Sequence, residues 1–126
     1  EARAVDETVI DGALSAAGAT PDLVELIEKA GPFGAGNPQP IFAFPAHRVV
    51  YAEPGNADQV RVRLRGSDGT VLSGVAFRAA NTPLGQALIA ARGQQAHVAG
   101  MLELDSWQGR TQVNLRICDV ALPEIG

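Results

Sequence analysis

The sequence predicts a mainly β domain: a small closed barrel of five strands, preceded by a short helix and a connector rich in proline and glycine. Three observations support this. Apolar and polar residues alternate with a period of two along five stretches after residue 40. Turn residues separate those stretches, and the chain holds 14 Gly and 8 Pro. One helical pattern stands between the third and fourth stretches, and closure would leave no strand edge unpaired.

The composition fits one folded domain. The 126 residues are 46% hydrophobic and 19% charged, which is typical of a folding chain. No apolar run approaches the roughly 20 residues of a membrane helix, and no signal-peptide pattern opens the chain, so we expect no membrane partner. The single cysteine, Cys118, excludes an internal disulfide and favours a reducing, cytoplasmic setting. The first residue, Glu1, suggests a piece of a larger protein.

We interpret residues 1–40 as a connector. A short strand is expected from Thr8 to Leu14, and a helix over about 21–30, where Thr20 can cap the first turn and Pro21 suits its first position. The apolar face of this helix is predicted to comprise Leu23, Val24, Leu26 and Ile27. The segment PFGAGNPQP at 32–40 lacks the lysine of a phosphate loop and the third glycine of a dinucleotide fingerprint, so a structured linker is favoured over a ligand loop.

The barrel is placed at 41–122, with a tail at 123–126. Pro45 interrupts the first strand and predicts an edge position or a bulge there. In the third strand Val71, Val75 and Phe77 share one side. A short helix opens at Thr82 and closes at Gly93. The strands are predicted at Ile41–Ala52, Gln59–Arg65, Thr70–Arg78, Gln95–Leu104 and Arg110–Val120, with turns at 66–69 and 105–109.

Three strands, a helix and two strands is the order of the oligonucleotide/oligosaccharide-binding (OB) barrel, whose ligand surface is the face of strands two and three between two loops. That face would carry Arg61, Arg63 and Arg65 in a row, at a spacing of about 6.6 Å that suits successive phosphates of an extended strand. Trp107 is expected in the last loop beside Arg110, where it can stack a base. Secondary candidates for DNA binding are Tyr51, Arg78 and Arg116. Alternatively, the arginine row is a solvated strand face and Trp107 closes the barrel end.

The charge distribution favours an anionic partner more than the net charge of −4 does. Residues 1–40 carry seven acidic against two basic residues, a balance of −5, whereas residues 41–116 carry eight arginines against five acids, a balance of +3. Nine of the ten basic residues are Arg, which suits planar contacts to phosphates and bases, although an arginine-rich codon usage would explain the same bias.

The sequence offers few candidates for catalytic residues. His47 and His97 lie 50 residues apart, without a second metal-type ligand at ligand spacing. Cys118 has no evident base partner and is expected to be a small buried hydrophobe. We therefore expect no enzyme activity from this chain alone, and neither a cofactor nor a metal.

Residues 32–42, PFGAGNPQPIF, resemble the segment Pro-Phe-Gly-x-Gly-Asn-Pro-x-Pro-x-Phe of the RecJ family. These proteins are bacterial single-stranded-DNA-specific 5′→3′ exonucleases of the DHH phosphoesterase superfamily. Three later stretches are similar to the family's C-terminal OB domain: GVAF at 74–77, LELDSWQGR at 102–110 and VNLRICD at 113–119. Asp105 departs from the family, which more often has Asn there.

The resemblance implies the OB domain and its connecting segment, cut from a nuclease core. The family's Asp-His-His and Gly-Gly-His motifs are absent from the chain, so the core's manganese or magnesium would be held elsewhere. The implied role is to hold single-stranded DNA for an exonuclease of recombination and repair. The alternative is a protein-interaction domain that docks the nuclease core or a single-stranded-DNA-binding protein. Its helix and Pro/Gly segment would then form a clamp anchored by Phe33 and Phe42, unless these rings pack under the barrel.

Overall fold

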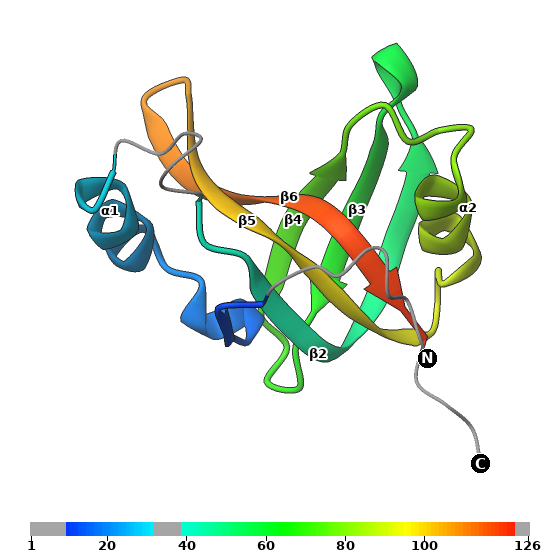
Figure 1. Ribbon diagram of the computed structural model, residues 1–126, viewed down its shortest axis with the longest axis horizontal. Helices are drawn as coiled ribbons and strands as arrows, with labels where there is room; N and C mark the ends of the chain where they lie inside the picture. The colour runs from blue at the N-terminus through cyan, green and yellow to red at the C-terminus, as the bar shows by residue number, and fades with distance from the viewer. Residues whose placement is uncertain (1–9, 32–38, 123–126) are drawn as a thin grey trace.

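A computed structural model describes residues 10–31 and 39–122. Most of the predicted Pro/Gly segment, including Phe33, and the tail at 123–126 therefore lie outside the described residues. The elements are β1 (Gly12–Ala13), η2 (Ala16–Gly18), α1 (Pro21–Lys29), β2 (Phe42–Pro54), η3 (Asn56–Asp58), β3 (Val60–Arg65), β4 (Val71–Ala76), α2 (Pro83–Ala90), β5 (Gln95–Trp107) and β6 (Arg110–Ala121). Figure 1 shows α1 and α2 on opposite sides of the sheet.

The strands close into a barrel. They lie in the order β1-β2-β3-β4-β6-β5, and a further antiparallel pairing of β2 with β5 joins the two ends. The five strands from β2 to β6, with α2 between β4 and β5, form the OB fold that the sequence predicts. The short β1 adds to β2 in parallel, so the expected strand at 8–14 is reduced to two residues among those described.

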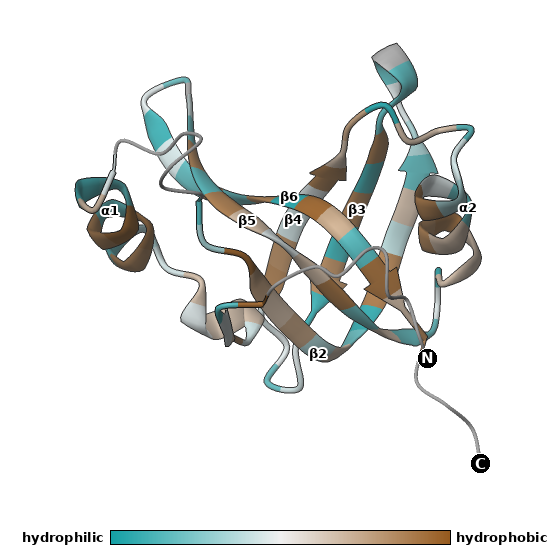
Figure 2. Cartoon of the chain, in the orientation of Figure 1, coloured by the Kyte–Doolittle hydropathy of each residue, from teal (hydrophilic) through white to brown (hydrophobic). Residues whose placement is uncertain are grey.

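Alternation along β3 builds one wall of the core. Val60, Val62 and Leu64 are buried, while the arginines between them are exposed, as the sequence predicts. Figure 2 shows this alternation as brown and teal bands along the strand. Apolar side chains from all five barrel strands meet inside; the largest fully buried ones from the strands are Phe44, Val49, Val60, Val62, Leu64, Val98 and Leu115.

The side of β4 that carries Val71, Val75 and Phe77 is the outer side. Val71 is 51% and Phe77 42% exposed, whereas the interior takes Leu72 and Ala76. Between these two inner residues stands Gly74, where β6 approaches β4 closely: a Cβ added to Gly74 would lie 3.0 Å from a backbone oxygen of β6. A Cβ on Gly100 of β5 would likewise overlap a carbonyl oxygen of β6. The seam along β6, where it packs against β4 and β5, is therefore tight at Gly74 and excludes a side chain at Gly100.

The bulge predicted at Pro45 is present. The register of β2 against β5 shifts between Phe44 and His47, and Ala46 has a φ of 55°. His97 Nδ1 accepts a hydrogen bond from the Ala46 amide at 2.9 Å. The buried His47 donates from Nδ1 to the Pro45 carbonyl at 2.9 Å and accepts at Nε2 from the Ala16 amide at 3.0 Å. Both histidines therefore serve the structure, and His47 ties η2 to the barrel.

Helix α1 begins as predicted: the Thr20 hydroxyl accepts a hydrogen bond from the Leu23 amide at 3.2 Å, and Pro21 is the first helical residue. Its apolar face is narrower than predicted. Val24 is fully buried and Ile27 packs against the core, but Leu26 is 64% exposed, so the prediction was wrong for Leu26. The reason is that this nine-residue helix contacts mainly β5 and β6, along one side.

The last hairpin is longer than predicted. Strand β5 continues to Trp107, and the turn shrinks to Gln108 and Gly109, whose φ angles are 52° and 76°. Two successive positive φ values are typical of a two-residue hairpin turn. Trp107 and Arg110 are therefore paired strand residues rather than loop residues, which corrects the predicted turn at 105–109.

Candidate functional site

A groove of about 620 Å³ crosses the outer face of the barrel. Its floor is β4, where Ser73 and Val75 line it, and its sides come from β2 and β3 on one hand and β5 and β6 on the other. In Figure 1 the η3 loop and the β5–β6 hairpin project from the same side of the barrel. Gln59, directly after η3, lines one end of the groove. The second and third barrel strands are β3 and β4, and the groove lies on the face of these strands where the sequence predicts a ligand surface.

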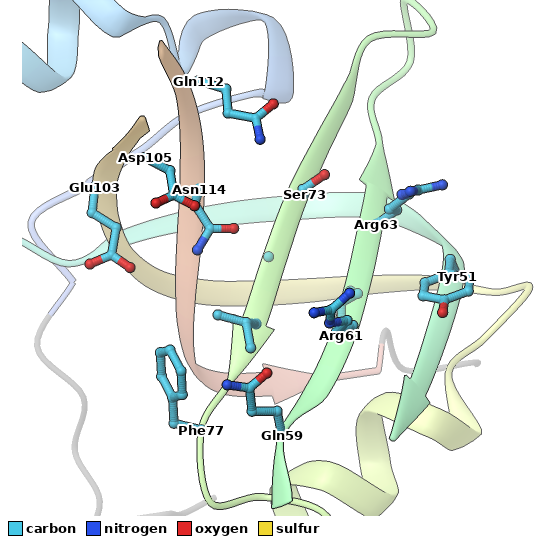
Figure 3. A pocket seen from close by; sticks show the side chains of 13 residues that line it. Tyr51, Gln59, Arg61, Arg63, Ser73, Phe77, Glu103, Asp105, Gln112 and Asn114 are labelled. Atoms are coloured by element: carbon cyan, nitrogen blue, oxygen red, sulfur yellow. The ribbon is translucent and has the colours of Figure 1, made fainter. Parts of the chain in front are cut away.

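The β2–β3 side of the groove is basic and aromatic. The exposed Arg61 and Arg63 come from β3, and Tyr51 comes from β2 (Figure 3). The guanidinium carbon of Arg63 lies 5.4 Å from the centre of the Tyr51 ring, a cation–π distance. The Tyr51 hydroxyl donates to Glu53 Oε1 at 3.3 Å, which orients the ring. This side can contact phosphates with its arginines and a base with its ring.

A second aromatic–arginine pair stands across the groove. Phe77 lines the groove just beyond the end of β4, and the guanidinium carbon of Arg116 lies 4.8 Å from its ring centre. Figure 3 shows Phe77 and Tyr51 on opposite sides of Arg61. An exposed ring on a basic surface is the usual stacking platform for an unpaired base.

The β5–β6 side is polar and carries two carboxylates. Glu103 and Asp105 of β5 are paired in register with Asn114 and Gln112 of β6, so all four side chains share one face. Figure 3 shows them across β4 from Arg61. The groove therefore has a cationic wall and a wall of carboxylates and amides.

The predicted binding residues do not all meet in this groove. Arg61, Arg63 and Tyr51 line it, and Arg116 reaches its edge through Phe77. Arg65 instead lines a smaller cleft with Arg48 and the turn after β3. Arg78 and Arg110 are exposed and are not among the described residues that line the groove. The side chain of Trp107 lies outside what the structure describes, so its predicted stacking role stays a prediction.

In that smaller cleft, Arg48 is the Cα partner of Arg65 and donates to the Gly93 carbonyl at 2.7 Å. The neighbouring turn is ordered by Asp68, which accepts a hydrogen bond from the Thr70 amide at 3.0 Å. That hydrogen bond lowers the pKa of the Asp68 carboxyl. The row of three predicted arginines is thus divided between two surfaces.

Sequence reasoning missed Phe77 and the whole β5–β6 wall. Phe77 resembles a core residue by type, and only the structure, in which it is 42% exposed just beyond β4, shows that it faces outward. The wall could have been found from alternation alone, because Glu103 and Asp105 alternate with inward leucines on β5.

The described residues offer little support for a metal site or a reactive cysteine. Within residues 10–31 and 39–122, no three His, Cys, Asp or Glu side chains cluster as metal ligands. Cys118 is exposed, which corrects the expectation of a buried hydrophobe. Partial burial of its sulfur, and next the neighbouring Asp119 carboxylate, raises the pKa of the Cys118 thiol. None of the helices in the described ranges is long and apolar enough to span a membrane.

Comparisons with known proteins agree with this architecture. A family described as the RecJ OB domain matches residues 10–119. Among solved structures, the chain is similar to RecJ in complex with Mg²⁺ from Thermus thermophilus, with 23% sequence identity and a TM-score of 0.52. That match covers 84% of this chain and 16% of the Thermus chain. The search of curated proteins gave no match.

Proposed function

Because the chain belongs to the RecJ OB-domain family, we propose that it binds single-stranded DNA for a RecJ-type 5′→3′ exonuclease. The observation that carries the proposal is the groove. Arg61 and Arg63 lie on its β3 side. Tyr51, which pairs with Arg63, and Phe77, which pairs with Arg116, both line the groove. Backbone-tracking cations combined with base-stacking rings are what sequence-tolerant binding of a single strand requires.

The remaining parts of the proposal rest on family membership. The chain spans 16% of the Thermus RecJ chain, so hydrolysis would belong to the rest of the parent protein, with its manganese or magnesium. This domain would be non-catalytic and would hold the strand for the nuclease core. We place the parent in the cytoplasm, in DNA recombination and repair.

The salt dependence of binding tests this function. A labelled oligonucleotide is titrated with the chain at several salt concentrations, and fluorescence anisotropy gives the affinity. Each phosphate neutralised on a single strand contributes about 0.7 to the slope of log K against log salt. The double variant Arg61→Gln/Arg63→Gln is therefore expected to lower that slope by about 1.4.

Lys29→Gln/Arg92→Gln is the matched control, because it also removes two positive charges, from exposed side chains that do not line the groove. Its slope should stay close to that of the unchanged chain. The function is rejected if single-stranded DNA does not bind at low salt, or if the groove variant and the control variant lower the slope alike.

A second candidate function is docking of the nuclease core or of a single-stranded-DNA-binding protein. The observation in its favour is α1, where Leu26 is 64% exposed beside the acidic Glu25. Leu26→Ser should then weaken capture of the separately produced nuclease core while leaving DNA affinity unchanged. Undiminished capture by Leu26→Ser would remove this candidate.

A further inference from the structure

We propose that the β5–β6 wall reads the bases, so that the groove prefers strands containing guanine over strands of thymine alone. This inference rests on the proposed function, because it concerns which single strands the same groove binds. It comes from a feature that binding of phosphates does not explain: two carboxylates line a groove that is proposed to hold a polyanion.

The wall is built for contact with a ligand. Glu103 lies directly opposite Asn114 and Asp105 directly opposite Gln112, so the two pairs present four polar groups along one stretch of the groove. Among the described residues, neither carboxylate forms an ion pair or a hydrogen bond. Their hydrogen-bonding capacity is therefore available to whatever occupies the groove.

The charges favour one orientation of a bound strand, although Arg116 of β6 adds a cation beside Phe77. The carboxylates repel phosphates, whereas Arg61 and Arg63 attract them, and the two walls are separated by β4 and β6. Neighbouring strands lie about 4.8 Å apart, so β3 and β5 are roughly 14 Å apart along the sheet. A strand that places its phosphates over β3 therefore turns its bases across β4 toward the opposite wall, beside Phe77.

The chemistry of the wall then distinguishes the bases. An ionised carboxylate only accepts hydrogen bonds, whereas the amides of Asn114 and Gln112 both donate and accept. Guanine presents two adjacent donors, N1–H and the exocyclic amino group, which match the two oxygens of one carboxylate. Thymine presents a single N–H between two carbonyl oxygens, which a carboxylate repels. The amides serve any base, and the carboxylates supply the preference.

Anisotropy titrations with two oligonucleotides of about ten nucleotides test the inference at one salt concentration. One is all thymidine, and the other alternates thymidine with guanosine, which avoids runs of guanine. We expect the alternating strand to bind roughly fivefold more tightly. In Glu103→Gln/Asp105→Asn the thymidine strand should gain affinity, and the preference should fall toward unity.

Glu25→Gln/Glu28→Gln is the matched control, because it removes two negative charges from exposed side chains of α1 that do not line the groove. It should keep the preference of the unchanged chain. Equal binding of both oligonucleotides overturns the inference while leaving the proposed function intact. The inference is likewise overturned, with the proposed function intact, if Glu103→Gln/Asp105→Asn gains affinity for both oligonucleotides by the same factor. Absence of binding to either strand overturns the proposed function and the inference with it.

Discussion

Replacing Phe77 by alanine is the sharpest test of how the groove holds a strand. The ring is 42% exposed, and Arg116 lies 4.8 Å from its centre. One face of the ring is thus occupied, which leaves the other for a single base. Stacking of one base contributes about 1–3 kcal/mol, and we take about 1.4 kcal/mol for a ring with only one open face. Phe77→Ala should therefore weaken binding of single-stranded DNA about tenfold.

The same substitution should leave the fold and the charge of the domain unchanged. Phe77 is outside the buried core cluster, and a cation–π contact at an exposed site is worth about 0.5–1 kcal/mol, so the free energy of unfolding should fall only slightly. Anisotropy titrations over a range of salt should give the weaker affinity with an unaltered slope, because no cation is lost. Phe77→Tyr should retain nearly full affinity. Unchanged affinity of the alanine variant, or a reduced slope, would refute the stacking role.

Three further predictions concern the fold and the cysteine. His47→Ala should lower the free energy of unfolding by about 2 kcal/mol in chemical denaturation, because the buried Ala16 amide loses its acceptor. The Ala16 amide should also exchange its hydrogen with solvent faster than in the unchanged chain. Gly100→Ala should destabilise the chain several times more than Gly18→Ala, whose added Cβ would meet only side-chain atoms at 3.7 Å, and equal melting temperatures would contradict this. Burial raises the pKa of the Cys118 thiol, so less thiolate is present at neutral pH. Alkylation near pH 8 should therefore be slower in the folded than in the urea-unfolded chain, and should accelerate at higher pH.

The barrel could be predicted from the sequence because its local signals agree with one another. The alternation of β3, the caps at Thr20 and Thr82, and the proline that marks the bulge each report a structure formed within a few residues. Where these local preferences and the final fold coincide, a pattern in the sequence is sufficient.

The groove was less accessible to prediction because it depends on which strands meet. Val71 and Phe77 have the composition of a core face, yet they face outward, since Leu72, Gly74 and Ala76 take the inner positions of β4. Arg65 follows Arg63 at the same spacing as Arg63 follows Arg61, but the end of β3 places it in the cleft of Arg48. The spacing of residues along one strand cannot predict these placements, because they depend on which strands pack together.

The seam at Gly74 and Gly100 bears on how such a domain can diversify. Close approach of β6 to β4 and β5 occurs at these two bare positions, whereas the η3 loop and the tip of the β5–β6 hairpin lie elsewhere, next to the groove-lining Gln59, Asp105 and Gln112. Insertions or exchanges in those two loops would reshape what the surface recognises and leave the packing of β6 against β4 and β5 untouched. The domain thus separates the part that must not vary from the parts that adapt to a new ligand.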